Sequence, residues 1–210
     1  MAEVPAAGRR EAGIGVTADK AAIREAVENW ALYRDTGRWE ALLRLYTPDA
    51  IVHTTWFVGS AREFVERGKQ AAARGGSRGQ HFVGAMSVEV AGERAIAEAR
   101  AMLLVRAPLQ GVEIDVTCYC RFYDWFVRMD GDWRIKMRGG IYEKDRIDPV
   151  DPSQRITLDP AVLARFPSAY RHIAYVQSSN GATITPDLPT PGSAALEKLY
   201  ADGNAWLHKS

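Results

Sequence analysis

The chain has 210 residues, of which 47% are hydrophobic and 25% charged, and its formal net charge is +1. This length and composition are typical of one soluble globular domain with an extension. The balanced charge argues against a nucleic-acid or anionic-membrane partner. No apolar run approaches the roughly 18 residues of a membrane-spanning helix, so we expect no membrane partner either.

Residues 1–16 are rich in Ala, Gly and Arg and lack the continuous apolar core of a secretory signal. We therefore expect this segment to be disordered and the protein to be cytoplasmic. Thr17 is suited to cap a long amphipathic helix that Gly37 ends, and Ser60 with Glu63 has capping-box spacing. These signals predict helices over residues 18–35, 39–46 and 60–74.

Strand-like segments follow, after an earlier β-rich run at residues 50–57. Turn signals, including Asp130-Gly131, separate four long strands predicted at 81–90, 94–107, 112–129 and 133–144. Apolar and polar side chains alternate along 112–129, as in a sheet with one face on the core. The sequence therefore predicts an α+β fold in which N-terminal helices cross the concave face of a curved antiparallel sheet and enclose a pocket.

Composition shifts near residue 148, where prolines become frequent. Two helical pieces, near 160–175 and 193–206, carry too many aromatic and aliphatic residues for a disordered tail. We divide the chain into a domain at 17–147 and a C-terminal extension at 148–210. The extension is expected to pack on the domain or on a neighbouring subunit, and the open face of the sheet favours a homodimer or homotrimer.

The two cysteines lie on the third long strand of the meander. Cys118 and Cys120 are two residues apart, so their side chains point the same way at a spacing that suits buried thiols better than a disulfide. No second Cys or His pair lies near them to complete a zinc site. We predict free, buried thiols and no metal.

Asp35 and His81 are the main catalytic candidates. Asp35 lies on the last turn of the first helix, where a carboxylate opposes the helix dipole, and His81 begins the first strand of the meander. A carboxylate facing an imidazole forms a general-base dyad, in which the carboxylate orients the ring and the ring removes a proton. The order of the elements indicates where these residues could meet but does not establish contact.

The order and spacing of several segments resemble the SnoaL-like branch of the nuclear-transport-factor-two-like superfamily, an α+β cone. The segments are Ile23-Arg24, Leu32 to Trp39, Tyr46 to Ala50, Gln80 to Gly84, Phe122 to Asp124, Asp130 to Ile135 and Ile141 to Arg146. The resemblance covers residues 17–152. It implies the fold more specifically than the function, because the superfamily includes dehydratases, isomerases, epoxide hydrolases, polyketide cyclases and binders without catalytic activity.

Within this superfamily, scytalone dehydratase and lindane dehydrochlorinase are similar to the chain at the positions of Asp35 and His81. The resemblance implies that these two residues act together as a base. Limonene epoxide hydrolase uses Asp and Arg on strands, and ketosteroid isomerase uses a strand Asp with a second acid. Asp124, a polar residue on an apolar strand face, is the candidate for such a role.

Four further residues are candidate substrate contacts: Tyr33, His53, Trp56 and Asp124. A buried carboxylate such as Asp124 needs a partner or a raised pKa. Strand alternation puts Arg138 on a polar face with Arg134 and Lys136, where a solvated position or a subunit interface is favoured over the alternative of anion binding.

The sequence has no phosphate-binding Gly-rich loop, nucleophile elbow or paired helical histidines. We therefore predict a lyase without cofactor or metal, acting on a small hydrophobic aromatic or alicyclic substrate. The reaction would be a dehydratase-like elimination or a C–C cleavage such as formaldehyde loss, in the catabolism of aromatic compounds. The alternatives are an isomerase related to ketosteroid isomerase, a polyketide cyclase, or a module that only binds a hydrophobic ligand.

Overall fold

The computed structural model describes residues 6–75 and 78–209. The helices are α1 (Ala6–Asp35), α2 (Trp39–Arg44), α3 (Ala61–Ala73), α4 (Pro160–Leu163), α5 (Arg171–Ser179) and α6 (Ala194–Leu207). The strands are β1 (Tyr46–His53), β2 (Val58–Ser60), β3 (Arg78–Ala91), β4 (Arg94–Leu109), β5 (Val112–Met129) and β6 (Asp132–Pro149). Among the described residues, no helix is both long and apolar enough to cross a membrane.

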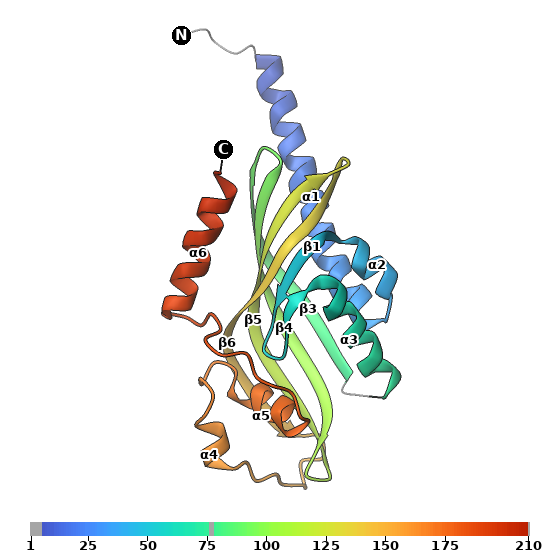
Figure 1. Ribbon diagram of the computed structural model, residues 1–210, viewed down its shortest axis with the longest axis vertical. Coiled ribbons are helices and arrows are strands. Elements are labelled where there is room, and N and C mark those ends of the chain that lie inside the picture. The colour runs from blue at the N-terminus through green and yellow to red at the C-terminus, as the bar shows by residue number, and fades with distance from the viewer. Residues whose placement is uncertain (1–5, 76–77, 210) are drawn as a thin grey trace.

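The six strands form one curved sheet in the order β2-β1-β6-β5-β4-β3, with α1, α2 and α3 on one side and α6 on the other (Figure 1). The predicted antiparallel meander from β3 to β6 is confirmed, whereas β1 pairs with β6 in parallel. Register shifts interrupt the pairing of β3 with β4 and of β5 with β6. Such irregularities bend a sheet, which explains how these long strands curve around the helices.

The first helix begins earlier than predicted. Because α1 starts at Ala6, the expectation of a disordered segment is wrong for residues 6–16, and residues 1–5 lie outside the described part. Ala, Arg and Glu are strong helix formers, and adding residues to an existing helix is easier than starting one. No proline lies between Ala6 and Gly37, so residues 6–16 extend the predicted helix toward the N-terminus.

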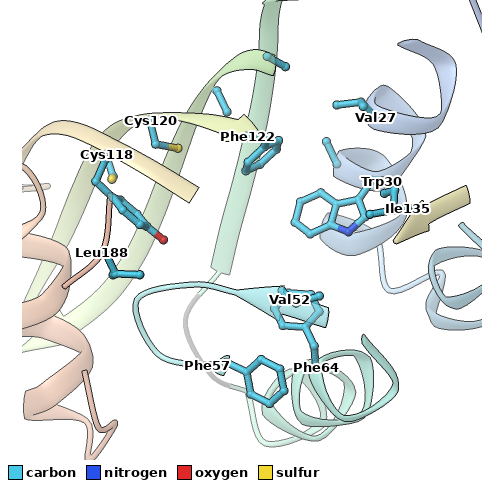
Figure 2. Packing of buried hydrophobic residues seen from close by; sticks show 14 of the residues in the cluster. Val27, Trp30, Val52, Phe57, Phe64, Cys118, Cys120, Phe122, Ile135 and Leu188 are labelled. Carbon is cyan, nitrogen blue, oxygen red and sulfur yellow. The ribbon is translucent and has the colours of Figure 1, made fainter. Parts of the chain in front are cut away.

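The core lies between α1 and the concave face of the sheet. Ile23, Val27 and Trp30 recur at helical spacing on α1 and are buried there. On β5 the predicted alternation is confirmed, because Ile114, Val116, Cys118, Cys120, Phe122 and Phe126 are all buried. Both thiols are free, as predicted. Figure 2 shows Trp30 and Phe122 pointing toward one another, with ring centroids 5.2 Å apart.

Helix α3 is positioned by its predicted cap. The Ser60 side chain accepts the backbone N–H of Glu63 and its hydroxyl donates to the Glu63 carboxylate. The buried face of this helix places Phe64 beside Trp56, with ring centroids 5.5 Å apart. The aromatic side chains of the domain interior therefore come from several separate elements, among them α1, α3, β5 and the β1–β2 connection.

The C-terminal extension packs on its own chain. Helix α5 lies against β5 and β6 at one end of the sheet, while α6 lies on the outer face (Figure 1). A second, smaller apolar cluster joins α6 to the sheet and consists of Tyr123, Ile141 and Leu196. The ring of Trp206 on α6 stacks on Trp125, with centroids 5.2 Å apart. Part of the face that we expected to mediate oligomer formation is therefore covered by α6, and the homodimer or homotrimer stays a prediction.

Candidate active site

Asp35 is held at the end of α1 by the residues that stop the helix. The Arg38 amide donates to the Tyr33 carbonyl at 2.8 Å, and Gly37 adopts a positive φ of 71°, a conformation that glycine reaches without steric cost. The Thr36 hydroxyl donates to the Leu32 carbonyl at 2.7 Å. This arrangement leaves the Asp35 carboxylate free to turn toward β3.

His81 on β3 meets that carboxylate in two places. Its backbone N–H donates to Asp35 Oδ2 at 2.6 Å, and its Nδ1 lies 2.6 Å from Asp35 Oδ1. The two side chains are only 14% and 16% exposed. A carboxylate beside Nδ1 favours the tautomer with a proton on that nitrogen, so Nε2 carries the lone pair. The structure therefore brings the two predicted residues into contact, with Nδ1 of His81 on the Asp35 carboxylate.

Both residues line a cavity of about 210 Å³ between the helices and the concave face of the sheet. Its wall includes the aromatic rings of Trp30, Trp56, Phe64, Phe122 and Tyr142. The Trp30 ring packs edge-on to His81 with centroids 5.2 Å apart, and Phe122 lies 6.1 Å from the same imidazole. A cavity of this size and lining suits a small aromatic or alicyclic molecule.

Arg138 lies inside the protein, which corrects its predicted place on a solvated face. It is 2% exposed and lines the cavity. The pairing of β5 with β6 shifts between Trp125 and Phe126, whose partners are Met137 and Ile135. This extra residue on β6 reverses the alternation, so that Ile135 and Arg138 both point inward.

The partner of Arg138 is Asp124, which is fully buried. Arg138 Nε donates to Asp124 Oδ1 at 2.7 Å and Nη2 donates to Oδ2 at 2.5 Å. Burial raises the pKa of Asp124, and the Arg138 guanidinium acts against that shift. Asp124 lies outside the cavity, so its prediction as a substrate contact is corrected: it holds Arg138 in place.

The guanidinium of Arg138 is clamped between the same two rings that contact His81. Its central carbon lies 4.1 Å from the Trp30 ring centroid and 4.4 Å from that of Phe122. The remaining nitrogen, Nη1, is buried and has no hydrogen-bond partner among the described residues. An imidazole and a guanidinium therefore lie against the same two aromatic rings at the cavity wall.

The other predicted contacts divide into two groups. His53 and Trp56 line the cavity, and partial burial lowers the pKa of His53. Tyr33 does not line it and lies instead beside the Arg38 guanidinium, 5.8 Å from its ring centroid. Residues two apart on a helix point in different directions, which explains why Tyr33 does not accompany Asp35.

Tyr142 and Gln177 are two of the cavity residues that the sequence analysis did not single out. Tyr142 on β6 accepts the Thr55 amide N–H on its hydroxyl at 3.1 Å, and burial raises its pKa well above the usual range, so the phenol stays protonated. Gln177 comes from α5, in the C-terminal extension. Tyr142 has no pattern that distinguishes it from a core residue. Gln177 could be found only by knowing that α5 reaches the cavity.

A second His–Asp contact lies at the start of α5. His172 Nδ1 lies 2.7 Å from Asp145 Oδ1, and the backbone N–H groups of His172 and Ile173 donate to Asp145 Oδ2 at 2.7 and 2.8 Å. Asp145 is fully buried and His172 is 26% exposed. His172 does not line the cavity. This pair joins the extension to β6.

The α+β fold agrees with a match to a known protein family. The chain belongs to the SnoaL-like domain family, which its sequence matches over residues 16–139. This finding confirms the resemblance drawn from the sequence and the α+β cone that it implied.

Relatives of the chain occur in fungi. Pea pathogenicity protein 2 of Fusarium vanettenii is 31% identical over 195 residues, covering 88% of this chain and 84% of the relative. An uncharacterised protein of Aspergillus terreus is 30% identical over 184 residues, covering 80% of this chain and 68% of that protein. The first match is longer than the SnoaL-like domain, so the likeness extends beyond it.

Solved structures share the fold at low sequence identity. A Novosphingobium aromaticivorans protein provisionally assigned as a scytalone dehydratase superposes with a TM-score of 0.53 and 18% identity, covering 67% of this chain and 97% of that chain. A Kribbella flavida protein has a TM-score of 0.51 and 16% identity, covering 59% of this chain and 89% of that chain. At these identities the two structures bear on the fold alone.

Proposed function

We propose that this protein is a lyase that uses only protein side chains to move a proton on a small aromatic or alicyclic substrate. Membership in the SnoaL-like family supports a small-molecule enzyme of the dehydratase or isomerase type. The observation that carries the finer proposal is the double contact of Asp35 with His81 on the wall of the cavity. The name of the Novosphingobium neighbour, a provisional scytalone dehydratase, agrees with an elimination.

In the proposed reaction, His81 Nε2 removes a proton from the carbon next to the bond that breaks. The electron pair of that C–H bond forms the new double bond, and the hydroxyl leaves as water with a proton returned by the imidazolium. Asp35 keeps the ring oriented and stabilises its positive charge while it holds the proton. A C–C cleavage would use the same base on a hydroxyl proton instead.

Arg138 has a defined part in this scheme. An oxygen that gains negative charge in the transition state needs a preorganised donor in a site with little water. Arg138 Nη1 is such a donor, because Asp124 occupies the other side of the guanidinium and the rings of Trp30 and Phe122 restrict its movement. The Tyr142 hydroxyl, which accepts the Thr55 amide N–H, keeps its own proton and is available to donate a hydrogen bond to the departing group.

The test is a screen in D₂O with purified wild type, His81→Ala and Asp35→Asn. Hydroxylated and carbonyl-bearing aromatic and alicyclic compounds are incubated without added cofactor, and product formation and deuterium exchange are followed by mass spectrometry. We expect turnover in the wild type alone. His208→Ala is the matched control, because His208 is exposed and remote from the cavity. Turnover retained in both dyad variants would refute the proposal, and binding without turnover in all proteins would favour a ligand-binding module.

A further inference from the structure

Helix α5 of the C-terminal extension presents one face to the cavity. Its cavity residues are Ile173, Val176 and Gln177, with Asn180 directly after its last turn. They lie at positions i, i+3, i+4 and i+7, which form a single stripe along a helix. The stripe begins with two aliphatic side chains and ends with two carboxamides, and none of the four is charged.

The extension is attached to residues that line the cavity. The Thr185 amide donates to the Thr55 carbonyl at 2.8 Å, and the Tyr142 amide donates to the Pro189 carbonyl at 2.9 Å. Thr55 and Tyr142 both line the cavity, and Asp145 holds the start of α5 on β6. Helix α5 is therefore a fixed part of the cavity wall.

Gln177 has an unmet hydrogen bond. Its Oε1 is buried and has no partner among the described residues. A buried polar atom without a partner is costly, and such groups in native proteins call for a reason. A carboxamide both accepts and donates hydrogen bonds and carries no charge, so it recognises a neutral hydroxyl better than an ion. Asn180, one turn further on, offers the same chemistry.

We propose that Gln177, with Asn180, forms a subsite that binds a neutral hydroxyl group on the substrate. The substrate then has an apolar ring against Ile173 and Val176 and a phenol or alcohol at the carboxamide end. This inference deepens the proposed function and rests on it for the identity of the cavity as a substrate site. It assigns a binding role to the C-terminal extension, outside the SnoaL-like match at 16–139.

The experiment compares two probes of nearly equal shape, p-cresol and p-xylene, which differ by a hydroxyl in place of a methyl. Their dissociation constants are measured by NMR titration on wild type and on Gln177→Met, an unbranched apolar replacement of similar size. We expect the dissociation constant of p-xylene divided by that of p-cresol to fall about fivefold in Gln177→Met, because a neutral hydrogen bond contributes about 1 kcal/mol. Asn180→Leu should lower the same ratio by a smaller factor.

A direct signature accompanies the titration. The side-chain amide resonances of Gln177, identified as those missing from Gln177→Met, should shift with p-cresol and stay in place with p-xylene. Ser179→Ala is the matched control on α5, because Ser179 is exposed and does not line the cavity. A ratio unchanged in Gln177→Met, or a cavity that binds neither probe, overturns the subsite.

The same titration on His81→Ala separates this inference from the proposed function. Binding does not require a base, so His81→Ala should keep the wild-type ratio. One outcome is that the ratio of dissociation constants falls in Gln177→Met while the wild type turns over no compound. That result would support the hydroxyl subsite and refute the proposed lyase activity. If compounds are turned over but the ratio never depends on Gln177, the lyase stands and the subsite fails.

Discussion

Asp35–His81 and Asp145–His172 are two pairs with nearly the same local geometry. In each, the carboxylate accepts the backbone N–H of the histidine and contacts its Nδ1, at 2.6 and 2.6 Å in the first pair and at 2.7 and 2.7 Å in the second. Their surroundings differ. The first pair lines the cavity beside Trp30, Phe122 and Arg138, whereas His172 lies outside it.

Asp145 has a further partner, the Ile173 amide, and so satisfies two N–H groups in the first turn of α5. The first amides of a helix have no partner within it, and a carboxylate there also favours the helix dipole. Asp35 lies at the opposite, unfavourable end of its helix. A His–Asp contact alone therefore does not indicate catalysis, and access to a cavity distinguishes the two pairs.

The largest expected effect is the loss of activity on removing the first pair. His81→Ala and Asp35→Asn should each lower kcat/KM by roughly 10²–10⁴-fold, the usual contribution of a positioned general base. Their thermal unfolding should stay close to that of the wild type, since both side chains lie at the wall of a cavity. His172→Ala, measured alongside, should keep most of the turnover. Equal losses in His81→Ala and His172→Ala would remove the distinction between the pairs.

The next effect concerns the cation beside the first pair. Arg138→Met should lower the free energy of unfolding by about 3–5 kcal/mol, because it leaves the Asp124 charge buried without a partner. The double variant Asp124→Leu/Arg138→Met should regain most of that stability and remain inactive. Urea unfolding and turnover assays check both results. A fully active double variant would show that Arg138 only stabilises the fold.

Removing the second pair should act on stability. Asp145→Ala leaves the His172 and Ile173 amides without an acceptor and should lower the free energy of unfolding by about 2–4 kcal/mol. Since α5 carries Gln177 into the cavity, binding of p-cresol should weaken as well. Urea unfolding and hydrogen exchange of the α5 amides measure these effects. Unchanged exchange in α5 would contradict the anchoring role.

The smallest expected effect is a pH dependence of stability that comes from Tyr46, the hydrogen-bond partner of Trp30. Trp30 Nε1 donates to the Tyr46 hydroxyl at 2.6 Å, and burial raises the pKa of Tyr46 to about 12. The raised pKa means that the folded state favours the neutral Tyr46 phenol. The stability that Tyr46 contributes in this way is complete below its pKa in the unfolded chain, about 10, and is lost as the pH rises toward 12. The free energy of unfolding of the wild type should fall by up to about 2–3 kcal/mol more than that of Tyr46→Phe over this range.

This difference in slope is measured by urea unfolding at a series of pH values from 8 to about 11.5. The constant loss caused by leaving Trp30 Nε1 without an acceptor affects Tyr46→Phe at every pH and does not alter the slope. Parallel curves for the two proteins would show that Tyr46 does not titrate abnormally.

Local patterns in the sequence predicted much of the fold. The alternation on β5, the Ser60 cap of α3 and the turn at Asp130-Gly131 act over a few residues, and each appears in the structure. The predicted N-terminal boundary of α1 was wrong, because the helix continues past the predicted cap at Thr17 to Ala6.

The candidate site was predictable where an element boundary marked it. Asp35 at a helix end and His81 at a strand start are local features, and the family resemblance brought them together. Arg138 was missed because one extra residue on β6 reversed its face. Asp124 was correctly expected on the inward face of its strand, but the sequence did not show that Arg138 takes up its carboxylate there. Tyr33 was assigned to the cavity without the direction of its side chain on the helix.

By itself, the sequence determined the α+β class, the order of helices and strands, the buried thiols and the positions of Asp35 and His81 on their elements. Hydrophobic periodicity, helix caps and turns depend on residues close together in the chain, so they can be recognised from the sequence. The tertiary structure alone decided that Asp35 meets His81, that Arg138 turns inward and that α5 supplies Gln177 to the cavity. These contacts join residues far apart in the chain, and only strand register and helix packing determine which side chains face one another.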